Sequence, residues 1–362
     1  LNKRERELIN KFNEIYNSKN IEELIDLELY GIKIHEHIFS TYCRQTLTAP
    51  QNINDIDFKR YKLIAVNVIK SIIYTNKILL KFKPSNTIAI HGIYLNHGPL
   101  VDLCKQNKMS LTIWGIPYRK KTYFMTKGDT YHRALMHVEK KLWNAPLTDF
   151  EKSKTISYLD SKESGGRDYW IYTGSVESNI ALEISKIPPE KKIFTIFTNV
   201  MWDAQIFYKN SLFKHQIDWI EFTINTLKER DDVHIVIRIH PGEADKYKSN
   251  EALEDKLKSL AKNVNPDKLT IIKPNDSFSS YELLKISKLS LIFGSKISLE
   301  SAYRNVPTII CGDSLFRQGE FTYLPLSRKD YKNLLLKDLP PLKDQKLYSI
   351  RFAHYIYFRV FR

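Results

Sequence analysis

The chain has 362 residues, 43% hydrophobic and 27% charged, a composition that excludes a wholly disordered or low-complexity protein. Lys and Arg number 56 against 41 Asp and Glu, and the net charge of +15 favours an anionic partner: nucleic acid, a phosphate-bearing small molecule or an acidic membrane surface. The three cysteines are odd in number and far apart, which excludes a disulfide framework and favours a reducing, cytoplasmic setting.

The first eighty residues predict helices. Apolar residues recur at helical spacing from Leu8 to Ile15, and a longer pattern runs from Phe58 to Leu80. Lysines and asparagines interrupt the most apolar stretch, 61–80, so it is too polar for a membrane span.

A β-α-β rhythm begins near residue 85. Apolar runs at 87–90 and 111–114 end at glycine-containing turns, and a helix-compatible stretch, 99–106, lies between them. We therefore expect an N-terminal domain, residues 1–174, that is helical at first and Rossmann-like from about residue 85.

The second half alternates strands and helices more clearly. Short apolar runs predict strands at 193–197, 233–239, 269–272, 289–293 and 308–311. Amphipathic patterns predict helices at 212–227, 253–260, 281–286 and 298–303. This alternation is typical of a parallel sheet covered on both faces. It predicts a Rossmann-like C-terminal domain, residues 175–340, after a crossing near 161–174, and a final helix, 341–362.

Residues that follow the predicted strands are candidates for a ligand site, because ligands of open α/β sheets bind beyond the carboxyl ends of the strands. These candidates are Asn199, Asp203, Arg238, His240, Gly294, Ser295, Lys296, Ser298 and Glu300. They combine hydroxyl, amide and cationic groups with two carboxylates, a mixture that suits a nucleotide.

The segment from Gly294 to Glu300 leads from a strand into a helix. Its serine hydroxyls, backbone N–H groups and Lys296 would suit a phosphate, and Glu300 would suit a ribose hydroxyl. The simpler alternative is that Ser295 or Ser298 caps the helix, Gly294 makes the turn and Glu300 complements the helix dipole.

Arg238 and His240 stand two residues apart, so a strand directs both side chains the same way, and Pro241 ends the strand after them. A cation and an imidazole at a strand exit suit a departing diphosphate or sugar phosphate.

The N-terminal domain offers candidate proton acceptors. His91 follows its first predicted strand, and Asp129 and His132 lie in the segment Gly128 to Arg133. Each is a candidate base for an incoming hydroxyl, although each taken alone also fits a hydrogen-bonded structural role.

Several familiar signatures are missing, namely GxGxxG, the GxxxxGK[ST] phosphate loop and HExxH, so dehydrogenase, phosphate-loop kinase and zinc protease functions lose their main support. Asp55 and Asp57 have the spacing of a metal-binding pair, but they precede a helix and fit a helix start. We expect no metal site and no cofactor.

The motifs together resemble a known family. His91-Gly92-x-Tyr94, Gly128-Asp129-Thr130-Tyr131-His132, Arg238-x-His240-Pro241 and Gly294-Ser295-x-x-Ser298-x-Glu300 occur in this order. The set looks like the capsule polysaccharide biosynthesis proteins, which are similar to GT-B glycosyltransferases of the Kdo-transferase and bacterial sialyltransferase type. The resemblance covers roughly residues 85 to 320.

The resemblance implies two Rossmann-like domains facing a cleft, the first binding an acceptor and the second a nucleotide sugar. It assigns nucleotide and phosphate contacts to His240, Ser295 and Ser298. We therefore expect a metal-independent glycosyltransferase that uses a CMP-, UDP- or GDP-sugar and a glycan or lipid-linked glycan acceptor.

Two other functions remain open at this point. A nucleotide-sugar 2-epimerase has a similar two-domain build and needs no acceptor. A nucleic-acid-binding protein would fit the net charge, but the basic residues are spread along the chain, so we expect no nucleic-acid partner.

The last segment, 347–362, interleaves six aromatic residues with three arginines. This is too much apolar surface for an exposed terminal helix. Two burials are open: packing across onto the first domain, or contact with an anionic inner membrane, which would make the protein cytoplasmic and peripherally membrane-bound.

Overall fold

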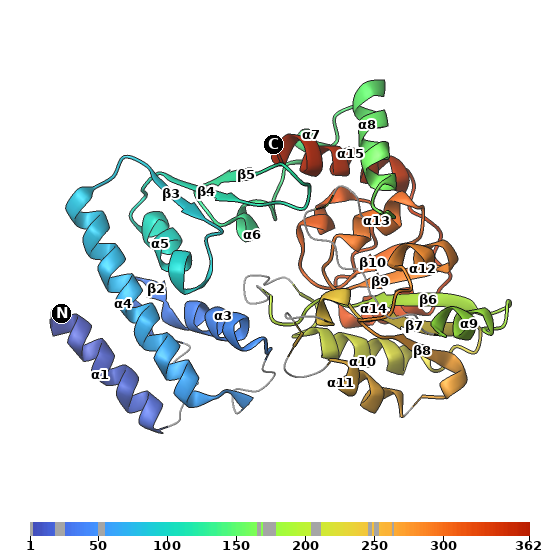
Figure 1. Ribbon diagram of the computed structural model, residues 1–362, viewed down its shortest axis with the longest axis horizontal. Coiled ribbons are helices and arrows are strands. Elements are labelled where there is room, and N and C mark those ends of the chain that lie inside the picture. Colours follow the sequence, from blue (N-terminus) through green and yellow to red (C-terminus); the bar gives the residue numbers. More distant parts are fainter. Residues whose placement is uncertain are drawn as a thin grey trace. The chain divides into compact units, whose positions relative to one another are not determined.

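The computed structural model describes residues 3–18, 26–49, 55–164, 168, 179–203, 211–244, 248–249, 253–262 and 264–362. Figure 1 shows the chain with its elements labelled. The described residues form two compact units. Unit 1 takes those within 1–116, 123–135 and 202–207, and unit 2 takes those within 117–122, 136–201 and 208–362.

Unit 2 is built on a five-stranded parallel sheet. Its strands are β6 (Lys192–Phe197), β7 (Val233–Arg238), β8 (Leu269–Ile272), β9 (Leu289–Ile292) and β10 (Thr308–Ile310). Their order across the sheet is β10-β9-β6-β7-β8, and every neighbouring pair is parallel. Counted from β6, this is the Rossmann order 3-2-1-4-5.

Helices connect the strands of unit 2 and cover the sheet. They include α9 (Ile180–Ser185), α10 (Gln216–Leu227), α11 (Leu253–Ala261), α12 (Ser280–Ile286), α13 (Ile297–Tyr303) and α14 (Arg328–Leu335). Helices α9 and α12 share one apolar cluster with the sheet residues Val236 and Ile292. On α10, Trp219 packs against Phe293, with ring centroids 5.7 Å apart. Burial on both faces explains why these strands are continuous apolar runs.

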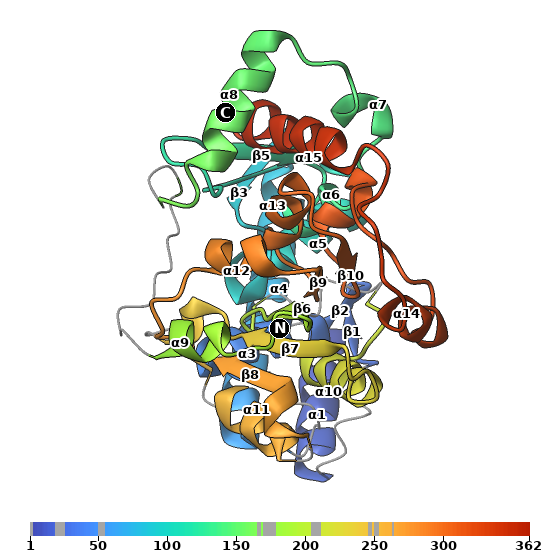
Figure 2. The same cartoon turned by 90° about the vertical axis from the view of Figure 1, so that its right-hand side faces the viewer.

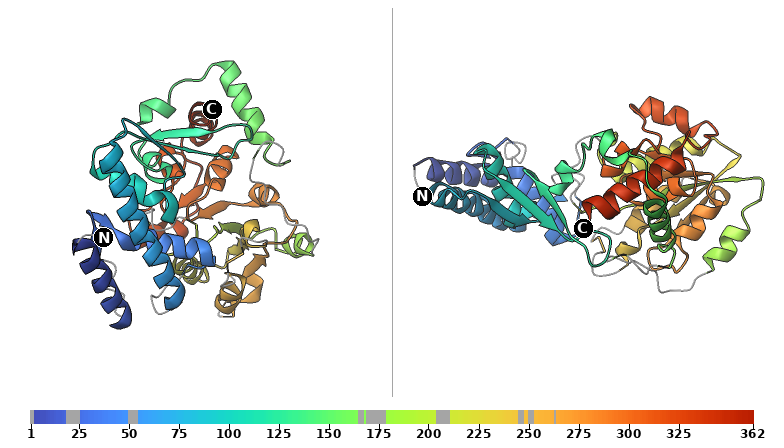
Figure 3. Two further views of the ribbon diagram at one scale, coloured as in Figure 1. Left: turned by 60° about the vertical axis from the view of Figure 1, so that its left-hand side comes forward. Right: turned by 90° about the horizontal axis from the view of Figure 1, so that it is seen from above.

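Unit 1 combines helices with a smaller sheet. Its helices are α1 (Lys3–Ser18), α3 (Ile34–Thr46), α4 (Phe58–Phe82), α5 (Tyr94–Gln106) and the short α6 (Tyr131–Ala134). The larger of its two sheets joins β3 (Thr87–Ile90), β4 (Leu111–Gly115) and β5 (Phe124–Lys127), with β3 parallel and β5 antiparallel to β4. A two-residue pair, β1 (Glu28–Leu29) and β2 (Ile32–Lys33), forms the other. Figure 3 shows the N-terminal helices in blue.

The predicted α/β fold class is confirmed. All five strands expected in the second half are present, as are the two expected at 87–90 and 111–114. The sequence analysis missed β5, because its four residues alternate buried and exposed and follow a run of basic residues. The expected arrangement of two domains around a cleft stays a prediction.

Unit 2 begins before the predicted domain boundary at residue 174. Residues 136–164, which the sequence analysis assigned to the N-terminal domain, belong to unit 2 with the helices α7 (Lys140–Trp143) and α8 (Asp149–Asp160). Of the expected crossing, 161–174, residues 165–167 and 169–174 lie outside the described residues.

The C-terminal segment packs inside unit 2. Helix α15 (Gln345–His354) contacts α13, α8 and α7, and a π-helical turn, η6 (Tyr355–Val360), follows it. Figure 2 shows α15 beside α8. Phe352 and Tyr357 are fully buried and Phe361 is 3% exposed, so core packing takes up these aromatics. The expected membrane contact of this segment stays a prediction.

Phe352 tests this packing, because its ring lies 5.6 Å from those of both Trp143 and Phe321. We expect Phe352→Ala to lower the free energy of unfolding by about 3–5 kcal/mol, since it leaves a cavity between three elements. Leu347→Ala, at a residue 37% exposed, is the control and should have a much smaller effect. Urea unfolding measures both, and equal small losses would contradict the burial.

Candidate functional site

The candidate site of unit 2 lies where the strand order reverses. The chain leaves β6 toward β7 on one side, and β9 later pairs on the other side. Connections therefore diverge from the carboxyl ends of β6 and β9, the place where open α/β sheets bind ligands. The exits of β9, β6 and β7 are neighbours, and each carries candidates named from the sequence.

Two residues after β6 tie the three exits together. Thr198 Oγ1 accepts a 2.9 Å hydrogen bond from the backbone N–H of His240, beyond β7. Asn199 Nδ2 donates a 2.8 Å bond to the carbonyl of Gly294, beyond β9. Gln216 of α10 holds Asn199 by its backbone N–H and carbonyl. Asn199 Oδ1 is buried with no hydrogen-bond partner among the described residues, so it can accept from a ligand.

His240 is neutral and has a defined tautomer. Its Nδ1 accepts a 3.0 Å bond from the backbone N–H of Gly242, so the proton of the neutral ring is on Nε2, which acts as a donor. Burial lowers the pKa of His240 to about 4, with help from the positive charges of Lys296 and Arg238. His240 and Lys296 follow β7 and β9, the two strands that flank β6.

Lys296 is the cation of the β9 exit. Its Nζ lies 2.9 Å from Asp168 Oδ2 and 5.1 Å from the centre of the Tyr118 ring. Burial alone would lower the pKa of Lys296, but the carboxylates of Glu300 and Asp168 outweigh it and the pKa is raised. Lys296 is therefore charged at neutral pH and held in place by its partners.

A second lysine completes a buried network. Lys162 Nζ, almost fully buried, lies 2.8 Å from Asp168 Oδ2 and 3.3 Å from Glu300 Oε1. Burial would raise the pKa of Asp168, but Lys296 and Lys162 lower it. Tyr281 donates a 3.1 Å bond to Glu300 Oε2. Glu300 is thus engaged inside unit 2, and these bonds favour a structural role over the expected ribose contact.

In the turn from Gly294 to Ser298, some of the hydrogen-bonding groups are paired with one another. Ser298 is fully buried, and both its backbone N–H and its Oγ donate to the carbonyl of Ser295. The side chain of Ser295 is half-buried. A Cβ on Gly294 would lie 2.8 Å from the carbonyl oxygen of Asp313, so this turn requires glycine. Ser298 therefore shapes the turn, while Ser295 and Lys296 are the turn residues suited to a ligand.

Arg238 binds backbone carbonyls, whereas a phosphate was expected as its partner. Its guanidinium donates to the backbone carbonyls of Lys273 and Asp276, in the loop between β8 and α12. Burial lowers the pKa of Arg238 to about 10, so it remains charged at neutral pH. Two of its nitrogens hold this loop, which favours a structural role; the expected phosphate contact stays a prediction.

In unit 1, His91 lies in a strained turn between β3 and α5. His91, Gly92 and Tyr94 have φ angles of 65°, 83° and 64°, and two of these residues are not glycine. Positive φ angles at residues other than glycine persist only where surrounding contacts hold the backbone in place, and they are concentrated at functional sites. Here Thr130 Oγ1 donates a 3.0 Å bond to the carbonyl of His91.

The His91 ring is suited to accepting a proton. Its Nδ1 is buried with no hydrogen-bond partner among the described residues. Burial lowers the pKa of His91, and Asp203 opposes the shift. The rings of Tyr94, Tyr131 and His132 surround it at centroid distances of 5.3–5.6 Å.

The other proposed bases differ from His91. Asp129 pairs with Lys105 at 2.5 Å and with Arg133 at 2.8 Å, so two cations engage its carboxylate. Burial places the pKa of His132 well below its usual value. Both remain candidates from the sequence, and His91 has the more suitable geometry.

Asp203, expected beside the nucleotide, is grouped with unit 1. Tyr94 donates a 3.0 Å hydrogen bond to its Oδ1. Next to it, Arg44 stacks over the Trp202 ring at 4.5 Å. The structure therefore places Asp203 in the His91 neighbourhood.

Sequence analysis missed Lys162 and Asp168. Both lie within the expected crossing, 161–174, and at least 128 residues before their partners Glu300 and Lys296. Neither belongs to a motif. The described residues contain no group of three or more His, Cys, Asp or Glu able to hold a metal ion.

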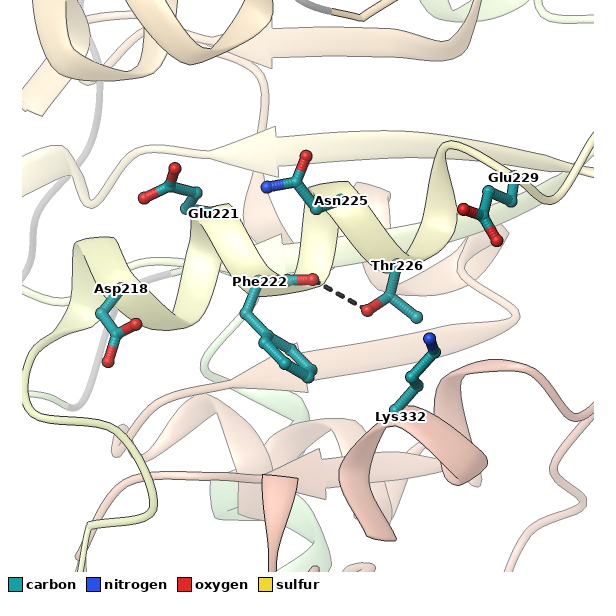
Figure 4. Close-up of a pocket in the computed structure, with 7 residues that line it drawn as sticks. All are labelled: Asp218, Glu221, Phe222, Asn225, Thr226, Glu229 and Lys332. Carbon is teal, nitrogen blue, oxygen red and sulfur yellow. Dashed lines mark hydrogen bonds between the residues drawn. The ribbon is translucent and has the colours of Figure 1, made fainter. Parts of the chain in front are cut away.

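A surface pocket lies elsewhere in unit 2, between α10 and α14. Figure 4 shows its lining, which includes Asp218, Glu221 and Glu229 with the single cation Lys332. Three carboxylates repel an anionic nucleotide, so this pocket is a poor candidate for the site.

No known protein family matches the sequence, and no curated protein matches it significantly. Among solved structures, the chain is similar to the KpsC beta Kdo 2,4 transferase of Thermosulfurimonas dismutans, at 9% identity over 71% of this chain and 76% of that one, with a TM-score of 0.46. It is also similar to a UDP-GlcNAc 2-epimerase of Methanocaldococcus jannaschii, in complex with UDP-GlcNAc and UDP, at 15% identity over 80% of each chain, with a TM-score of 0.35. Likenesses this distant do not decide the activity.

His240 provides a direct test of the site's electrostatics. We expect its imidazole to titrate at about 4, because burial disfavours the charged ring. The unfolded chain binds this proton at about pH 6.5, so His240 contributes a loss of stability as pH falls from about 6.5 to 4. NMR titration of the imidazole signals measures the midpoint, with His240→Gln identifying the resonance. A midpoint near 6.5 would contradict the burial.

Proposed function

We propose that the chain is a metal-independent glycosyltransferase that moves a sugar from a nucleotide-sugar donor to a growing bacterial surface glycan, of the capsule or lipopolysaccharide type. One observation carries this proposal: Lys296, His240 and Asn199, whose Oδ1 has no hydrogen-bond partner among the described residues, follow three adjacent strands of the sheet. A cation, a neutral donor and an acceptor are the groups that a sugar nucleotide needs.

Lys296 and His240 would act on the leaving group. In the transfer, the bond between the anomeric carbon and the phosphate oxygen breaks, and the phosphate keeps the electron pair. The fixed positive charge of Lys296 and the Nε2–H of His240 stabilise the negative charge that develops there. Because Asp168 holds Lys296, the ammonium need not reorganise during the reaction.

The Oδ1 of Asn199 would accept from a hydroxyl or amino group of the nucleotide. Its backbone and its Nδ2 are already engaged by Gln216 and Gly294, so the amide is fixed in orientation before a ligand binds. Fixing a polar group in advance lowers the entropic cost of recognition. CMP, UDP and GDP are all candidate nucleotides.

His91 would act on the acceptor. In an inverting reaction the acceptor oxygen forms the new bond to the anomeric carbon, and its proton passes to Nδ1 of His91, which has no hydrogen-bond partner within the described part of the chain. A lowered pKa keeps the imidazole neutral and able to take that proton at neutral pH. A retaining reaction would remove this role. The acceptor is a glycan or a lipid-linked glycan, and the site of action is cytoplasmic.

Nucleotide binding tests the donor site. We expect His240→Ala and Ser295→Ala each to weaken nucleotide affinity by about tenfold, the value of one hydrogen bond to a charged group. Thermal shift and calorimetry with CMP, UDP and GDP measure the loss. Ser327→Ala, which removes a helix cap at α14, is the matched control and should leave affinity unchanged. Unchanged affinity in both site variants would remove the donor-site assignment.

Measurements of turnover distinguish a glycosyltransferase from a nucleotide-sugar 2-epimerase. We expect sugar transfer to require an acceptor and to survive EDTA, because Lys296 supplies a fixed positive charge at the leaving phosphate. Product analysis by mass spectrometry and NMR with each nucleotide sugar, with and without an acceptor glycan, is the measurement. Formation of an epimer without acceptor would identify a 2-epimerase. Loss of turnover in EDTA, restored by Mg²⁺, would contradict the metal-independent mechanism.

A further inference from the structure

We propose that the exposed face of α4 in unit 1 binds the surface of an anionic lipid bilayer. This face is defined by Leu63, Lys70, Tyr74, Ile78, Lys81, Phe82 and the following Lys83. The proposal concerns an interaction surface, does not depend on the glycosyltransferase function, and uses residues other than the C-terminal aromatics.

The helix exposes large apolar side chains along several turns. Tyr74, Ile78 and Phe82 are 63%, 55% and 68% exposed, and Leu63, three turns earlier, is 64% exposed. A spacing of four residues places Tyr74, Ile78 and Phe82 on adjacent turns of one side. Scattered apolar residues are normal on surfaces, but three large exposed side chains on adjacent turns, Tyr74, Ile78 and Phe82, form a patch of the kind that marks an interaction site.

The charge of the same segment fits an acidic partner. Residues 58–83 carry the seven cations Lys59, Arg60, Lys62, Lys70, Lys77, Lys81 and Lys83, and no Asp or Glu. Lys70, Lys81 and Lys83 are exposed. Lys81 Nζ lies 5.3 Å from the centre of the Phe82 ring, so charge and aromatic surface stand side by side. Lysines beside exposed aromatics are typical of a helix that lies in the headgroup region.

The buried face of α4 argues against a membrane-spanning role for the helix. By length and composition α4 is a candidate membrane span, the one such helix among the described residues, although the stretch 61–80 was expected to be too polar for one. The buried face, however, packs against α3 and α5, and 44% of the helix's most apolar window is buried. Residues such as Ile64, Val68 and Ile72 would lose these contacts on insertion. The buried face anchors the helix, and the exposed face is available.

Vesicle binding by the full chain tests this surface. We expect co-sedimentation with vesicles of phosphatidylcholine and phosphatidylglycerol, weak binding to phosphatidylcholine alone, and loss of binding at high salt. The triple variant Lys70→Gln, Lys81→Gln, Lys83→Gln should bind about a hundredfold more weakly, because each lysine near the surface contributes about a factor of five. Its control, Lys152→Gln, Lys329→Gln, Lys337→Gln, removes the same charge from exposed sites of unit 2 and should bind like the parent chain.

A second pair of variants separates lipid from other polyanions. Tyr74→Ser with Phe82→Ser should weaken vesicle binding about tenfold or more, since apolar side chains enter the bilayer surface. Phe150→Ser with Leu326→Ser, at residues 75% and 88% exposed in unit 2, is the control. No binding to anionic vesicles, or equal losses in variants and controls, would overturn the proposal. So would vesicle binding that is insensitive to Tyr74 and Phe82, which would point to a general polyanion surface such as one for nucleic acid.

Discussion

The reversal of strand order at β6 is the constraint on which the site depends. Because β7 and β9 flank β6 and all three strands are parallel, their exits must lie side by side at one edge. Hydrogen bonds then fix this edge: Thr198 joins the β7 exit and Asn199 joins the β9 exit. Residues nearly a hundred positions apart in the chain are thereby held together without a bound ligand.

Buried charge gives this edge its electrostatic character. Lys162 and Lys296 share Asp168, and Lys162 also reaches Glu300, so two cations and two carboxylates balance inside unit 2. Desolvating four charges is costly, and such a group is weak evidence for stability. Its clearer consequence is geometric, because Lys162 and Tyr158 hold Asp168, and Asp168 in turn holds the Lys296 ammonium. A lysine on a flexible stem thus becomes a fixed charge.

Sequence patterns predicted the sheet of unit 2 well, because a strand buried on both faces is a continuous apolar run. They failed at β5, where Thr126 and Lys127 leave only two apolar residues in succession within the strand. They correctly placed His240 and Lys296 after strands, and the ligand roles of these two residues stay predictions. They did not predict that Glu300 pairs with Lys162 or that Asp203 bonds Tyr94, because a partner distant in sequence leaves no local signal.

The net charge of +15 is not concentrated at the exits of β6, β7 and β9. Lys162, Lys296, Asp168 and Glu300 sum to zero, and Arg238 faces backbone carbonyls. In contrast, residues 58–83 carry seven cations and no carboxylate of their own. Lys77 pairs with Glu5 of α1, and the exposed Lys70, Lys81 and Lys83 lie in the same segment as the exposed Tyr74 and Phe82. A catalytic edge needs a few fixed charges of defined geometry, whereas attraction to a surface needs many exposed ones within a Debye length. The total charge therefore does not distinguish the fixed charges at the strand exits from the exposed charges of residues 58–83. The distribution of charge along the chain does.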